Sequence, residues 1–114
     1  MTSKCEHIGA ILALNPEGQL NSGNAAAAEA EIMEHLARGT NQLLLDFSEL
    51  DYISSAGLRV VLVAAKRLKQ SAGQLVLCGL RPHIREVFDI SGFLTILTVA
   101  ETRQQALQQF KSIV

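Results

Sequence analysis

The sequence predicts an α/β fold in one domain, 1–114, with a mixed, mostly parallel β-sheet and helices packed on it. Three observations lead to this prediction. The chain has 114 residues, 48% of them hydrophobic, which suits one compact core. Short apolar runs alternate with longer segments of helical periodicity. Residues 42–47 and 74–78 are nearly continuous apolar runs, which is typical of strands buried on both faces.

The elements are expected in the order β-β-α-β-α-β-α-β-α, over residues 8–14, 19–20, 25–38, 42–47, 56–72, 74–78, 82–91, 93–99 and 101–113. The first strand is an apolar run, and Asn15-Pro16-Glu17-Gly18 is expected to end it as a turn. Ser22 or Asn24 can cap the first helix, which is rich in Ala and Glu and ends before Gly39.

Similar signals define the second half of the chain. Residues 48–53 are interpreted as a connector between the third strand and the second helix. Gly73 ends that helix. Pro82 stands at a favoured first-turn position of the third helix, and Gly92 closes it. β-Branched residues within 93–99 predict the last strand, before a C-terminal helix.

Composition excludes several classes of function. The chain has 10 Lys and Arg against 11 Asp and Glu, so its charge balance gives no indication of nucleic-acid binding, which is driven by neutralisation of phosphates. No apolar run approaches the roughly 20 residues of a membrane span, and no signal peptide is recognisable, so we expect a cytoplasmic protein. Cys5 and Cys78 are far apart and the histidines are scattered, so neither a disulfide nor a metal site is expected, and Cys78 is assigned to the core.

The second helix has two apolar faces. One is expected to face the sheet, at the spacing of Leu58, Val61, Leu62, Ala65 and Leu68. The opposite face holds two valines flanked by arginines: Ala56, Arg59, Val60, Val63 and Arg67. Three explanations remain open for that face. Its valines are single exposed apolar residues of the kind normal on protein surfaces, another helix covers the face, or the face is a docking surface for a partner.

Ser54 and Ser55 stand just before this helix. Either can be its N-cap, since a hydroxyl there accepts hydrogen bonds from free backbone N–H groups. A serine at a helix N-terminus is also a good site for a phosphoryl group, because the helix dipole stabilises negative charge there. Such a modification would change the charge beside a docking face and so control binding rather than catalysis.

Catalysis is not expected from the same segment. Asp46, Glu49 and Asp51 precede Ser55 and are interpreted as a solvated connector rather than as acid–base groups or a Mg²⁺ site. No histidine lies nearby in sequence to activate the serine, and neither a Gly-x-Ser-x-Gly elbow nor a P-loop is present. The chain is therefore expected not to be an enzyme.

One segment resembles the phosphorylation segment of STAS domains, specifically that of the bacterial anti-sigma factor antagonists. It comprises residues 51–61, Asp-Tyr-Ile-Ser-Ser-Ala-Gly-Leu-Arg-Val-Val. That family typically has Asp-Ser-Ser/Thr-Gly-Leu, and its first serine accepts the phosphoryl group. Ser55 matches that serine, Ala56 stands at the second hydroxyl position, and Gly57-Leu58 follow. Gly18-Gln19-Leu20-Asn21 and residues 88–93 resemble two further family segments, so the likeness covers nearly the whole chain.

The resemblance implies a partner-switching role. The unphosphorylated form would bind an anti-sigma factor that is also a serine kinase of the histidine-kinase-like ATPase type, and so release the target of that factor. That kinase would supply ATP and Mg²⁺, phosphorylate Ser55 and release the protein, and a serine phosphatase would restore binding. The protein itself would be a monomer that forms a heterocomplex and carries no cofactor. The expected partner-binding residues are Asn21, Ser54, Ser55, Ala56, Arg59, Val60, Val63 and Arg67.

The chain departs from the family at two positions. Ser54 and Asn21 stand where many members have Asp, which removes two carboxylates near the phosphorylation site. Ser54 is thus a second candidate acceptor, after Ser55. Two alternative functions also remain: the same switch acting on a target other than a sigma factor, such as a secretion or biofilm regulator, and an unphosphorylated STAS scaffold or ligand-sensing module.

Overall fold

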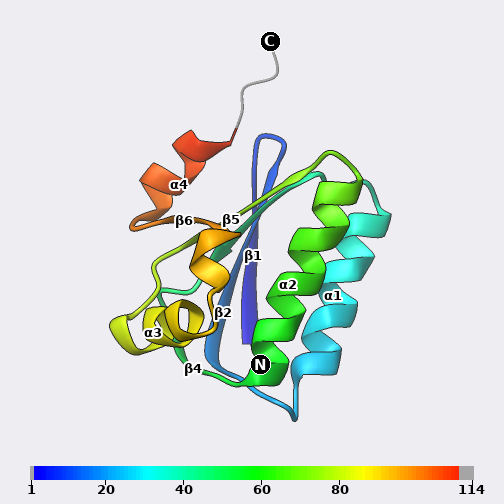
Figure 1. Cartoon of the computed structure of the whole chain (residues 1–114). Helices are drawn as coiled ribbons and strands as arrows, with labels where there is room; N and C mark the ends of the chain where they lie inside the picture. The colour runs from blue at the N-terminus through cyan, green and yellow to red at the C-terminus, as the bar shows by residue number, and fades with distance from the viewer. Residues whose placement is uncertain (1, 111–114) are drawn as a thin grey trace.

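The computed structural model describes residues 2–110 and contains a mixed sheet (Figure 1). The strands lie in the order β1-β2-β3-β5-β6, and β4 pairs with the end of β2. β1 and β2 are antiparallel, whereas every other pair is parallel, which confirms the predicted α/β class. The strands are β1 (Thr2–Ile8), β2 (Ile11–Leu20), β3 (Gln42–Asp46), β4 (Leu50–Ile53), β5 (Gln74–Cys78) and β6 (Thr98–Ala100).

The helices cover both faces of the sheet. α1 (Ala25–Ala37) and α2 (Ser55–Gln70) lie side by side on one face, and α4 (Arg103–Gln109) lies on the other (Figure 1). α3 (Pro82–Ile90) packs beside β4. All four helices were expected, and the part of the last one predicted at 111–113 lies outside the described residues. Within residues 2–110, no helix is both long and apolar enough to cross a bilayer.

Two apolar clusters form the core. The larger lies between the sheet and α1, α2 and α3, and the smaller lies under α4. β3 and β5 contribute to both, since Leu43 and Leu77 point into the larger cluster while Leu44 and Val76 point into the smaller. This explains why their sequences lack polar alternation. Cys78 is buried in the smaller cluster, as expected, and it is not joined to the exposed Cys5.

The N-terminal hairpin differs from the prediction. The apolar run 8–14 was expected to be one strand, but a turn at Gly9 and Ala10 divides it. Gly9 has φ +60°, a conformation that glycine adopts without steric cost, and this permits the tight turn between β1 and β2. β1 was not anticipated because it is a mostly polar strand at the sheet edge, where an apolar pattern is not needed.

The turn expected at residues 15–18 is also wrong, because β2 continues through it to Leu20. Pairing of β2 with β3 ends at Leu14. Pro16 therefore lies where β2 no longer has β3 as a neighbour, and its lack of a backbone N–H costs no hydrogen bond to that strand. At Gly18, with φ +81°, the register shifts and β2 takes β4 as its new parallel neighbour. Turn-forming residues here mark an irregular strand rather than its end.

Two shorter elements were also misassigned. The connector expected at 48–53 contains β4, in which the end residues Leu50 and Ile53 are buried while the two residues between them are exposed. The last strand was expected within 93–99, but Phe93–Thr95 forms a 3₁₀ turn (η1) and the strand β6 follows at Thr98–Ala100. The observed order therefore has β4 inserted before α2, which brings the start of α2 against the end of β2.

Candidate functional site at the start of α2

Ser54 holds the start of α2 in place. As the N-cap residue, its Oγ accepts a hydrogen bond from the Gly57 N–H at 3.3 Å, and its carbonyl accepts one from Leu58 at 2.9 Å. The Ser54 N–H donates to the Leu20 carbonyl at 2.9 Å, which fixes this point beside the end of β2. The hydroxyl of Ser54 is thus engaged in capping the helix.

Ser55 is placed differently. It is the first residue of α2, it is exposed, and its hydroxyl makes no hydrogen bond to any residue in the described range 2–110. The free N–H groups of the first turn and the positive end of the helix dipole lie next to it. An added phosphoryl group at this position would therefore meet favourable electrostatics and little steric hindrance.

Gly57 explains how the helix start comes so close to the sheet. A Cβ at this position would lie 2.7 Å from both the Leu20 carbonyl oxygen and Ile53 Cγ1. A backbone oxygen cannot rotate away, so any side chain here would push α2 off the ends of β2 and β4. Glycine is needed to hold Ser54 and Ser55 at this edge.

Asn21 lies beside this site, since it follows Leu20, the residue bonded to Ser54. Its Oδ1 accepts a hydrogen bond from the Gly23 N–H at 2.9 Å, and its own N–H donates to Asn24 Oδ1 at 2.8 Å. Asn24 is the N-cap residue of α1, but its side chain bonds back into the loop rather than to the helix. The Asn21 amide is engaged in holding the turn between β2 and α1.

The docking face expected on α2 is only partly exposed. Arg59 and Arg67 are exposed, and Ala56 and Val63 are half-buried. Val60, however, is only 2% exposed, so its assignment to the outward face is wrong. The physical reason is that α1 packs against α2 and covers Val60, which was one of the three explanations left open.

A groove of ≈ 370 Å³ remains between the two helices next to the site. Its α2 wall consists of Ala56, Arg59 and Val60, and its α1 wall includes Ala26 and Glu29. Three of the predicted partner-binding residues therefore line one concave feature.

Two surface features near the site were not predicted. Tyr52, on β4 just before Ser54, is 49% exposed, and aromatic side chains are enriched at protein interfaces. Lys66 is exposed on the same side of α2 as Ser55 and Arg59. The spacing from Ser55 through Arg59 to Lys66 was the available signal for Lys66, whereas exposure of Tyr52 depends on β4, which was not anticipated.

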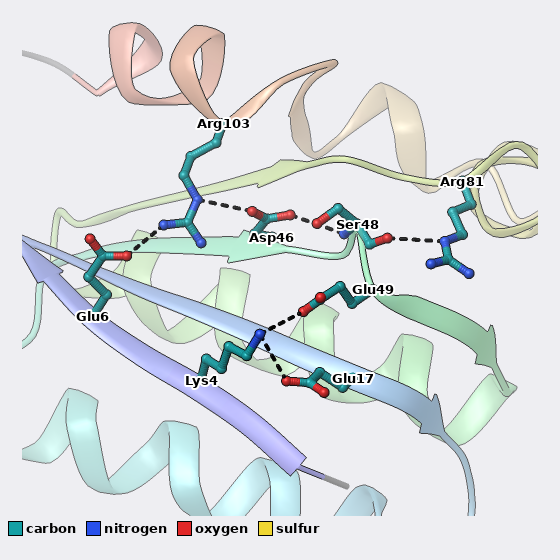
Figure 2. Close-up of polar contacts among 8 residues, drawn as sticks. All are labelled: Lys4, Glu6, Glu17, Asp46, Ser48, Glu49, Arg81 and Arg103. Carbon is teal, nitrogen blue, oxygen red and sulfur yellow. Dashed lines mark hydrogen bonds and ion pairs between the residues drawn. The ribbon is translucent and has the colours of Figure 1, made fainter.

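The acidic residues before Ser55 are held in ion pairs (Figure 2). Asp46 accepts a hydrogen bond from Arg103 at 3.0 Å, and Glu49 lies 3.4 Å from Lys4. Asp51 pairs with Arg81. Within residues 2–110, no group of three or more His, Cys, Asp or Glu side chains is arranged to hold a metal ion. Through their ion pairs, Asp51 and Asp46 link the strands to the starts of α3 and α4, whereas Glu49 is linked to β1.

Asp46 is the most buried of these groups. Burial by itself raises the pKa of its carboxyl, but hydrogen bonds from Ser48 and the ion pair with Arg103 outweigh burial and hold that pKa below its ordinary value. Arg103 also reaches Glu6 on β1 at 2.8 Å (Figure 2). The result is a structural link between α4, β3 and β1, on the opposite face of the sheet from α1 and α2.

Known proteins are similar to this chain over most of its length. The family model described as STAS domain matches residues 3–106. A Bordetella bronchiseptica protein named as an anti-sigma factor antagonist, BtrV, is 54% identical over 96 residues, covering 84% of this chain and 83% of that protein. The names of these relatives describe antagonists of anti-sigma factors and not enzymes, in agreement with the expectation for this chain.

Solved structures agree with the fold. A Thermotoga maritima protein described as an anti-sigma factor antagonist has a TM-score of 0.93 at 21% identity, covering 96% of this chain and 95% of that one. The Bacillus cell fate determinant SpoIIAA in its phosphorylated form has a TM-score of 0.74 at 23% identity, covering 95% and 98%. At these identities the likeness establishes the fold alone. Together with the family match over residues 3–106, it leads to one conclusion: the chain belongs to the STAS domain family.

Proposed function

We propose that the chain is an anti-sigma factor antagonist whose binding is ended by phosphorylation of Ser55. The observation that supports this proposal most strongly is that the hydroxyl groups of the two serines are placed differently. The Ser54 hydroxyl caps α2, while the Ser55 hydroxyl is exposed and unbonded within residues 2–110. The name of the relative BtrV, 54% identical, supports the antagonist role, and the phosphorylated form of SpoIIAA supports the kind of modification.

The partner in this proposal is an anti-sigma factor that is also a serine kinase of the histidine-kinase-like ATPase type. The Ser55 Oγ attacks the γ-phosphorus of ATP, the hydroxyl proton passes to a base of the kinase, and ADP leaves. ATP and Mg²⁺ belong to the kinase, and a serine phosphatase hydrolyses the phosphoester to restore binding. The protein acts in the cytoplasm as a monomer that forms a heterocomplex.

The physical basis of release is a change of charge at a desolvated contact. A phosphoryl group adds about −1.5 to −2 charges at neutral pH. At Ser55 it would lie beside Ala56, Arg59 and the groove between α1 and α2. A partner that packs there would have to desolvate the new charge, which disfavours the complex. The phosphoryl group would leave the fold intact, because the helix start stabilises it.

The test is an intact-mass measurement of protein purified from its native cells, followed by peptide mapping. We expect one phosphoryl group on Ser55, lost in Ser55→Ala and retained in Ser54→Ala. The Ser55→Ala protein cannot be phosphorylated at this position, so it should co-purify with the kinase under all growth conditions. Phosphate on Ser54 alone would reassign the phosphorylation site to Ser54. Absence of phosphate from both serines under all growth conditions would favour a constitutive scaffold module instead.

A further inference from the structure

The exposed side of α2 continues in line from Ser55. Residues spaced by four and three positions lie on one side of a helix. Here this rule aligns a set that we call the outer stripe: Ser55, Arg59, Leu62, Lys66 and Lys69. All are exposed except Leu62, which is half-buried against the core. The stripe extends for about 21 Å along the helix axis.

The cations of this helix are unpaired. α2 contains four basic residues and no acidic one: Arg59, Lys66, Arg67 and Lys69. None of them forms an ion pair with any residue in the described range, 2–110. Elsewhere the fold pairs its cations with carboxylates, as at Lys4, Arg38, Arg81 and Arg103. Among the other described Lys and Arg residues, only Arg85 also lacks an ion pair.

We infer that the outer stripe is a docking surface for an acidic face of the partner protein. This inference rests on the proposed function and specifies the partner's chemistry. Unpaired cations close together on one helix repel one another, and a complementary set of carboxylates would relieve that repulsion while steering association. Leu62 and the neighbouring half-buried Val63 supply apolar contact between the charges.

The surroundings favour a protein over a nucleic acid or a membrane. α1 lies directly beside α2 and carries Glu29, Glu31 and Glu34 but no Lys or Arg. The whole chain has a net charge of −1. A duplex or a charged bilayer would bring phosphates against those glutamates as well as against the stripe. A narrow acidic ridge on a protein can contact the stripe alone.

Ser55 lies at the start of the outer stripe, so its phosphorylation would change the charge of the stripe. Ser55 and Arg59 are one helical turn apart, so a phosphoryl group on Ser55 would neutralise Arg59 and place negative charge at the start of a positive surface. An acidic partner would then meet repulsion where it had met attraction. Charge at this point changes binding more than the same charge would elsewhere on the protein.

The experiment uses the purified kinase that phosphorylates Ser55 as the probe, with unphosphorylated protein. Arg59→Glu and Lys66→Glu should each raise the dissociation constant about tenfold, and raising the salt concentration should weaken wild-type binding. The matched control is Arg85→Glu, an exposed cation on α3 that is likewise without an ion pair in the described range, which should change the constant by no more than about twofold. Unchanged thermal unfolding of all three variants establishes that they fold.

Each outcome decides between the two proposals. If Ser55 is phosphorylated but both reversals behave like Arg85→Glu, the inference fails and the proposed function stands. If no kinase acts on Ser55, both fail. A short DNA duplex and vesicles containing anionic lipid are tested in parallel. Binding to either that Lys66→Glu abolishes, with binding to the kinase unaffected, would overturn the assignment to a protein partner.

Discussion

Replacing Val60 tests how α2 is oriented. Val60 is 2% exposed, lies under α1 and borders a small apolar cavity of ≈ 20 Å³, whereas Val63, one turn later, is half-buried. Val60→Ala removes two buried carbon atoms, worth about 1.6 kcal/mol at about 0.8 each, and the enlarged cavity raises the loss to about 2 kcal/mol. Val63→Ala should lower the free energy of unfolding by less than about 1 kcal/mol.

Urea unfolding followed by circular dichroism measures both variants. For a domain of this size, Val60→Ala should lower the midpoint by about 1 M urea and the melting temperature by about 8 °C, with the slope unchanged. Val63→Ala is the matched control, since it makes the same chemical change on the same helix. An equal or larger loss for Val63→Ala would mean that α2 presents a different face to α1, and the account of the groove would be wrong.

Three other outcomes follow from the same structure. Ser54→Ala removes the N-cap hydrogen bond to Gly57 and should lower the free energy of unfolding by about 1 kcal/mol in thermal unfolding, while leaving phosphorylation of the neighbouring serine intact. Asp46 has a lowered pKa in the folded state, so its contribution to stability is present above about pH 4 and is lost as the pH falls through the folded-state pKa. Asp46→Asn should therefore be less stable than wild type at neutral pH, and the two proteins should converge in acid; a constant difference across pH would contradict this. Burial raises the pKa of Cys78 to about 12, so a thiol reagent at mildly alkaline pH should modify Cys5 at once and Cys78 only on unfolding.

The sequence predicted most reliably the elements whose burial leaves a clear pattern of apolar residues. The buried strands β3 and β5 were predicted because both of their faces are apolar, and the four helices because their propensities and end signals agree. β4 was missed because its two middle residues, Asp51 and Tyr52, are exposed and the strand is only four residues long. Nothing local in so short a segment distinguishes a strand from a connector.

The error at Val60 has a different origin. Helical periodicity identifies apolar positions, but it does not reveal how many neighbours a helix has. α2 packs against the sheet and also against α1, so its buried arc is wider than one stripe and extends round to Val60 and Ala64. In the expected sheet-facing stripe, Leu58, Val61 and Leu68 are buried, whereas Leu62 and Ala65 are only half-buried.

The candidate site was located by its motif, and its geometry adds what the motif leaves open. From the sequence, Ser54 and Ser55 were equally able to cap α2. The hydrogen bond from Gly57 to Ser54 assigns the cap, and the contacts around Gly57 explain why the helix begins so close to β2. Lys66 and Lys69 lay outside the motif, so only their alignment with Ser55 on one exposed face draws attention to them.

The decisive measurement compares the affinity of one kinase for two forms of the protein. These are the unphosphorylated form and a form with phosphoserine incorporated at position 55. We expect phosphoserine at position 55 to raise the dissociation constant about 100-fold or more while the fold is retained. Equal affinity of the unphosphorylated and Ser55-phosphorylated forms would contradict the claim that phosphorylation of Ser55 ends binding.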